Sequence, residues 1–198
     1  MKKTLKWFVF AMTFCLILMF STLFRPWIKK LRTERYMLKY ENTIQEVCRR
    51  FSLSPSVYFS VVYAERLHNV NHLDKADFSR ARLGFDASVG FAQLKISTCE
   101  WIELHHSDLL PFSSSNSRSH LIRRLSYPDT NIVYSAVYCC LIKDRFEERF
   151  GYSPDVAALG SYYGRGIDYG KTMDQEFYLN KLGLTAYDYY THHFKTDP

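Results

Sequence analysis

The chain has 198 residues, of which 47% are hydrophobic and 17% aromatic, and this size fits one compact domain with a short additional segment. The formal net charge is +6, but residues 1–39 contain nine Lys/Arg and one Glu, which leaves 17 Lys/Arg and 19 Asp/Glu for the rest. The part expected to fold therefore has no positive excess for phosphate groups, and this distribution argues against nucleic-acid binding.

An apolar segment without any charged residue lies near the N-terminus, between Trp7 and Phe24. Its length is about the minimum for a membrane-spanning helix. It ends in Leu-Phe-Arg-Pro-Trp and not in the small residues of a signal-peptide cleavage site. We therefore expect an N-terminal transmembrane helix in an uncleaved signal anchor (1–25), a basic juxtamembrane arm (26–39) and a folded domain (40–198).

The basic residues after this segment outnumber those before it, and the positive-inside rule alone would place the domain in the cytoplasm. The functional interpretation below favours the opposite side. We accordingly expect a single-pass protein of the inner (cytoplasmic) membrane, held by residues 7–24, with its domain in the periplasm or cell-wall space.

The first predicted elements of the folded part are two helices. Over residues 40–51, Ile44, Val47, Cys48 and Phe51 share one helical face. The next helix starts with Ser54 as N-cap and Pro55 at its first position, and it is apolar on nearly all sides. This second helix is expected to be buried.

Residues 69–89 have no sustained period and are expected to form a loop with at most one helical turn. Ser97 and Glu100 have the spacing of a capping box that opens a helix. The longest predicted helix ends at Gly151, a further helix starts at Ser153-Pro154, and short Tyr-rich helices complete the chain. No strand is convincing, so the fold class is mostly α.

Four cysteines lie outside the apolar segment without the spacing of a metal site: Cys48, Cys99, Cys139 and Cys140. Disulfides in an oxidising compartment and buried free thiols both remain open.

A single carboxylate, Glu65, closes the apolar helix after residues 57–64. Burial of an ionised carboxylate is costly, so a buried Glu either pairs with a cation or has a raised pKa. Arg66 is adjacent, but neighbouring helical residues do not face each other. The alternative is a Glu at a helix end that turns toward solvent.

Four short motifs in order, over roughly residues 54–166, resemble those of the lysozyme-like lytic transglycosylases. They are Glu65 at the end of its helix, Ser88-Val89-Gly90-Phe91-Ala92-Gln93-Leu94 followed by Ser97-Thr98, Pro128 with Asn131, Ile132, Ser135 and Tyr138, and Gly160-Ser161-Tyr162-Tyr163-Gly164. The resemblance implies a lysozyme-like domain. Three positions depart from the pattern of the family, because Arg66 stands where Ser is usual, Tyr163 where Asn is usual and Ser135 where Gly is common.

The resemblance also implies a mechanism with one carboxylate. Glu65 would protonate the glycosidic oxygen between N-acetylmuramic acid and N-acetylglucosamine, and would then accept the proton of the C6 hydroxyl as a 1,6-anhydro ring closes. Tyr162 would position or polarise Glu65 through its hydroxyl. Gly90 would let the backbone approach the sugar, and Gln93 would supply an amide near the N-acetyl group. The substrate-binding candidates are Ser88, Gly90, Phe91, Gln93 and Tyr163.

Two alternative functions remain open. A peptidoglycan hydrolase would use Glu65 with Asp86 or Asp74 as second carboxylate, although a loop-capping role suits Asp86 better. A catalytically inactive envelope-binding scaffold of the same fold is favoured by Arg66 and Tyr163.

The sequence implies no cofactor and no metal site, because His68 and His72 lack a metal-site pattern around them. The expected partners are peptidoglycan glycan strands, with an envelope protein complex as a further candidate.

Overall fold

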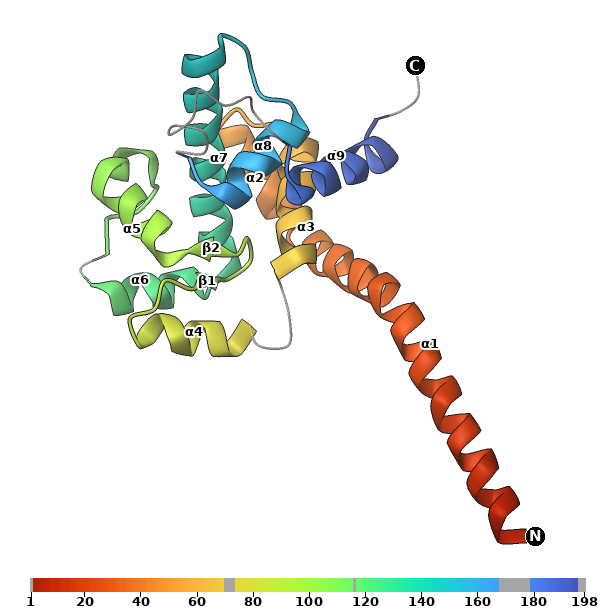
Figure 1. Cartoon of the computed structure of the whole chain (residues 1–198). Coiled ribbons are helices and arrows are strands. Elements are labelled where there is room, and N and C mark those ends of the chain that lie inside the picture. The colour runs from red at the N-terminus through yellow and green to blue at the C-terminus, as the bar shows by residue number, and fades with distance from the viewer. Residues whose placement is uncertain (1, 70–73, 116, 168–178, 196–198) are drawn as a thin grey trace.

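The computed structural model describes residues 2–69, 74–115, 117–167 and 179–195 (Figure 1). These residues form a mostly helical body from which one long helix projects. The elements are α1 (Lys2–Leu38), α2 (Glu41–Arg50), α3 (Pro55–Asn69), α4 (Asp74–Arg82), β1 (Ser88–Val89), β2 (Leu94–Lys95), α5 (Ile96–His105), the 3-10 helix η1 (Ser107–Leu109), α6 (Arg118–Leu125), α7 (Pro128–Phe150), α8 (Val156–Arg165) and α9 (Lys181–His193).

The predicted transmembrane helix is corrected by the structure. The apolar segment belongs to a longer helix, α1, which has 37 residues and continues through Pro26 into the basic residues that follow. Over the part of the chain that the structure describes, none of the helices combines the length and the apolar content that a membrane crossing needs. The predicted single-pass location in the inner membrane, with a periplasmic domain, depended on this helix and is corrected with it.

The last turns of α1 pack against α3. Met37 is fully buried in the core, and Thr33 is also buried. Glu34 accepts a hydrogen bond from the hydroxyl of Tyr189 in α9, at 2.9 Å. The C-terminal end of α1 is thus part of the folded body, whereas apolar residues nearer its N-terminus, such as Trp7 and Phe20, are exposed.

The helical predictions for the first half of the folded part are confirmed. Helix α2 buries Ile44, Val47 and Cys48, and α3 begins at Pro55. Helix α3 is buried along most of its length and packs on α8 and α9. Its Tyr58 hydroxyl reaches α7, where it contacts the hydroxyl of Ser135.

The remaining elements agree with the predictions only in part. Helix α4 is longer than one turn, and an antiparallel hairpin pairs Ser88 with Lys95 and Val89 with Leu94. Helix α5 begins without the predicted capping box, because its first turn is capped from a distance by Asp86. Helix α7 ends as predicted at Gly151, which has a φ of 75°.

The four cysteines of the folded part are free thiols, and three of them are buried. Burial raises the pKa of Cys48 to about 12, so this thiol stays protonated at neutral pH. The structure therefore supports buried free thiols, which act as small apolar residues of the core, and not disulfides.

Candidate functional site

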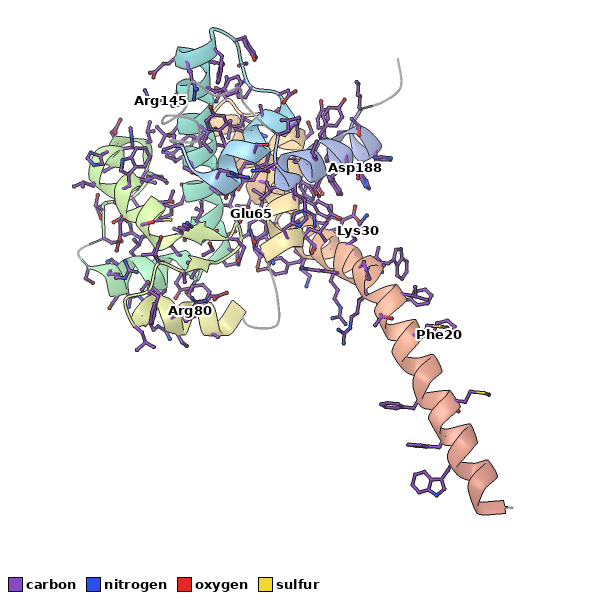
Figure 2. All side chains as sticks on the ribbon, in the orientation of Figure 1. Phe20, Lys30, Glu65, Arg80, Arg145 and Asp188 are labelled. Carbon is purple, nitrogen blue, oxygen red and sulfur yellow. The ribbon has the colours of Figure 1, made fainter. Side chains whose placement is uncertain are left out.

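Glu65, the one acidic residue of α3, is buried and lies inside the folded body (Figure 2). Only 5% of the residue is exposed. Its Oε1 accepts a hydrogen bond from the amide of Asn69, one turn further along the helix. Its Oε2 is buried and has no hydrogen-bond partner within the described part of the chain. One carboxylate oxygen is therefore held, and the other is left without a donor.

This environment changes the acidity of Glu65. Removal from water raises its pKa from 4.5 to about 7, while the Asn69 hydrogen bond and the charge of Lys95 act in the opposite direction. In a substantial fraction of the molecules, the side chain of Glu65 is then protonated near neutral pH. Such a carboxyl group can donate a proton, as a general acid must.

The turn of the hairpin, between Val89 and Leu94, has two residues in the left-handed region. Gly90 has a φ of 81° and Gln93 a φ of 53°. The amide of Gln93 donates to the carbonyl of Gly90 at 3.1 Å, so the side chain folds back over its own turn. A left-handed conformation is uncommon for a residue other than glycine, and it occurs preferentially where a structure is held for a function.

Asn131 of α7 holds this turn from one side. Its Oδ1 accepts from the backbone N–H of Ala92 at 2.7 Å, and its Nδ2 donates to the carbonyls of Val89 and Leu125, both at 3.2 Å. A Cβ atom on Gly90 would lie only 2.2 Å from Asn131 Nδ2. Gly90 is thus required by the close approach of Asn131, a reason that the motif alone does not show.

Helix α8 contacts both the turn and Glu65. The hydroxyl of Tyr163 donates to the carbonyl of Ala92 at 2.9 Å, and burial raises the pKa of Tyr163 well above its usual range, which keeps this donor protonated. Gly164 faces Glu65, since a Cβ atom there would lie 3.7 Å from Oε2. The structure therefore brings all four motifs together around the hairpin turn.

The two adjacent tyrosines of α8 point in different directions, as consecutive helical residues do. The ring of Tyr162 packs edge-on against Phe146 of α7, with centroids 5.6 Å apart. Tyr163, which the sequence places among substrate-binding residues, is the one whose hydroxyl reaches the turn.

Two other predicted substrate-binding residues are partly or fully inside the fold. Phe91 is buried, and its ring lies 5.3 Å from that of Tyr40 and 5.7 Å from that of Tyr36. Ser88 is half-buried in β1. Phe91 therefore supports the turn from beneath rather than offering a surface.

The candidates for a second carboxylate have other positions. Both oxygens of Asp86 accept hydrogen bonds from Ser97, one from the backbone N–H and one from the hydroxyl, each at 2.9 Å. This confirms a capping role. Asp74 begins α4, but its side chain lies outside what the structure describes.

The structure describes only one residue of the histidine pair. The Nε2 of His68 lies 2.9 Å from the hydroxyl of Thr185, and His72 is outside the described residues. No cluster of potential metal ligands occurs among the residues that the structure describes.

Three residues at the site received no role from the sequence: Asn69, Lys95 and Asn131. The position of Asn69, four residues after Glu65, is a signal that helical geometry makes available. Asn131 belongs to a motif, but only the folded chain shows that it contacts the turn.

Comparison with known proteins adds no relative, since no protein-family model matches the chain and no curated protein is significantly similar to it. The resemblance to lytic transglycosylases therefore remains a prediction from the four motifs.

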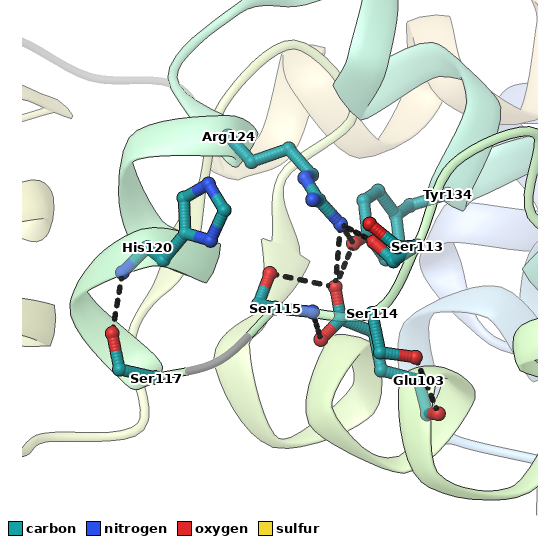
Figure 3. A network of polar contacts seen from close by, with 8 residues as sticks. All are labelled: Glu103, Ser113, Ser114, Ser115, Ser117, His120, Arg124 and Tyr134. Carbon is teal, nitrogen blue, oxygen red and sulfur yellow. Dashed lines mark hydrogen bonds and ion pairs between the residues drawn. The ribbon is translucent and has the colours of Figure 1, made fainter.

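A second partly buried carboxylate, Glu103 of α5, lies in a dense polar network (Figure 3). Its Oε1 accepts from Arg124 Nη1 at 3.0 Å, from the Ser115 hydroxyl at 2.8 Å and from the Tyr134 hydroxyl. Its Oε2 accepts from the backbone N–H of Ser115 at 2.7 Å. This network ties the loop after η1 to α6 and α7.

Proposed function

We propose that the protein cleaves the glycosidic bond between N-acetylmuramic acid and N-acetylglucosamine in peptidoglycan, as a lytic transglycosylase. The observation that carries this proposal is the state of Glu65, a buried carboxyl group with a pKa raised to about 7 and an Oε2 without a hydrogen-bond partner among the described residues. The four motifs that meet around the hairpin turn support peptidoglycan as the substrate.

The first step uses the protonated form of Glu65. Its proton passes to the glycosidic oxygen, the bond between this oxygen and C1 breaks, and the N-acetylglucosamine side leaves as an alcohol. Glu65 is then an ionised carboxylate beside a positively polarised C1. The hydrogen bond from Asn69 and the charge of Lys95 stabilise this ionised state.

The second step restores Glu65. The C6 hydroxyl of the muramoyl residue attacks C1, a new bond forms between O6 and C1, and the hydroxyl proton passes to Glu65. The product carries a 1,6-anhydro ring, and no water is consumed. One carboxyl group thus acts first as acid and then as base.

The surroundings of Asp86 favour this reaction over hydrolysis. A hydrolase of the usual kind needs a second carboxylate to activate water or to act on the sugar. Both oxygens of Asp86 are engaged by Ser97, so this carboxylate serves the start of α5. A mechanism in which the substrate provides its own nucleophile does not need it.

The test is the chemistry of the products. Purified peptidoglycan is digested with the full chain, and the released muropeptides are analysed by mass spectrometry. We expect fragments lighter by one water than those of a hydrolase, and their loss with Glu65→Gln. Hydrated fragments would replace the proposal with a hydrolase. Binding of glycan by a folded protein without any product would leave the inactive scaffold.

A further inference from the structure

Arg66, the residue next to Glu65, is the departure from the family pattern that stands closest to the site. It is 8% exposed, which is rare for an arginine. Its guanidinium carbon lies 4.4 Å from the ring centroid of Tyr36 and 5.3 Å from that of Phe91. The guanidinium therefore contacts the last turns of α1 on one ring and the hairpin turn on the other.

The same guanidinium also bonds to the backbone of the turn. Its Nη1 donates to the carbonyl of Phe91, and lies 3.5 Å from the carbonyl of Gly90. Asn131 binds the turn through the N–H of Ala92 and the carbonyl of Val89. Two side chains from two helices thus hold one short turn, and both bind the peptide group between Phe91 and Ala92, Arg66 at its carbonyl and Asn131 at its N–H.

The position of Arg66 also explains why its positive charge, next to Glu65 in the sequence, is compatible with a raised pKa of Glu65. The charge that acts on the pKa of Glu65 is that of Lys95, and the guanidinium of Arg66 is engaged with the turn and two aromatic rings. Because adjacent helical side chains diverge, Glu65 and Arg66 face different directions from the same helix end. Glu65 is partly protonated near neutral pH, and the guanidinium of Arg66 binds the turn.

We propose that Arg66 is a positioning residue, which holds the Gly90–Gln93 turn at a set distance from Glu65 and uses Tyr36 of α1 as one wall of its own site. The catalytic consequence rests on the function proposed above; the anchoring of the turn does not. Consecutive residues of α3 carry the acid and the anchor of the turn, so any shift of one relative to the other is small.

The test combines removal with chemical rescue. Arg66→Ala in the full chain leaves a space between two rings that a free guanidinium ion fits. We expect kcat/KM on peptidoglycan to fall by about 100-fold, the effect of a displacement of about 1 Å at a site. Millimolar guanidinium, below any effect on the unfolding midpoint, should restore much of the loss, whereas methylammonium should not. Arg145→Ala, which removes an exposed arginine of α7, is the matched control.

A second measurement does not depend on activity. Amide hydrogen exchange at Ala92 and Gln93 should be faster in Arg66→Ala and slow again with guanidinium, while exchange in the middle of α7 stays unchanged. An unaltered turn with unaltered kcat/KM would overturn the proposal, and so would a general rise in exchange with no rescue. If the wild-type chain releases no product, the proposed function fails, and the exchange result alone decides whether Arg66 anchors the turn.

Discussion

Glu65 and Glu103 are both largely withdrawn from water, yet their surroundings are opposite. Glu103 accepts hydrogen bonds on both oxygens and has the guanidinium of Arg124 at 3.0 Å. Glu65 accepts one from Asn69 on Oε1, and its Oε2 has no partner in the described structure. Burial is common to both, so the two carboxylates differ in the supply of hydrogen-bond donors.

The physical reason is the cost of an unsatisfied charge. A buried carboxylate that is fully hydrogen-bonded and paired keeps its charge, and removal of one partner is strongly unfavourable. A buried carboxylate without enough donors is more stable when protonated. The fold thus ties α5, α6 and α7 together through Glu103 and raises the pKa of Glu65.

The largest expected effect comes from the same substitution at the two positions. Glu65→Gln removes the proton that is transferred, and we expect product formation to fall by about 10² to 10⁴-fold, the usual contribution of general acid-base catalysis. Glu103→Gln should keep the activity per folded molecule within a few-fold of wild type. The measurement is the rate of anhydro-muropeptide release. Equal losses in both variants would show that the two carboxylates do not differ in this way.

The second effect is on stability and has the reverse order. Glu103→Gln leaves Arg124 without its ion pair in a setting where Arg124 and Glu103 side chains are only 13% and 9% exposed. We expect the free energy of unfolding to fall by about 3 kcal/mol, as for other broken buried pairs. Glu65→Gln should cost little, since it replaces a group that burial already disfavours as an anion. Urea unfolding of the three proteins at neutral pH compares them.

The third effect, which is no larger than the second, is the part of the pH dependence of stability that Glu65 contributes. Its pKa is raised from 4.5 to about 7 in the folded protein, so the folded state binds the proton more tightly than the unfolded chain. This contribution is complete below about pH 4.5 and is lost as the pH rises through about 7, to a total of at most about 3 kcal/mol. We expect the unfolding free energy of wild type minus that of Glu65→Gln to fall across this range. A difference that stays constant with pH would contradict a raised pKa.

Local patterns predicted most of the helices. The apolar face of residues 40–51, the Ser54-Pro55 start and the Gly151 stop each depend on neighbours within a few residues, and each is confirmed. The hairpin at Ser88 to Lys95 was not predictable in this way. Its strands have two residues each, and the side chain that holds its turn, Asn131, lies about forty positions later in the chain.

The start of α5 shows the same limit. Ser97 and Glu100 have the spacing of a capping box, but the first turn takes its hydrogen bonds from Asp86, eleven residues before Ser97. The carboxylate that caps the helix thus comes from Asp86, before the helix, and not from Glu100 within it. The transmembrane prediction for residues 7–24 is wrong, since none of the helices in the described part of the chain is long and apolar enough to cross a membrane.

Residue order alone identified Glu65 as a solitary carboxylate in an apolar helix, because burial of such a helix follows from its composition. It also placed the four motifs in sequence. Only the tertiary structure decided which oxygen of Glu65 lacks a donor, why Gly90 must be glycine, which of the two tyrosines of α8 reaches the turn, and where the charge of Arg66 is used. Each of these depends on the direction of a side chain from one helix relative to a neighbour far away in the chain, and direction is set by packing, which no local pattern encodes.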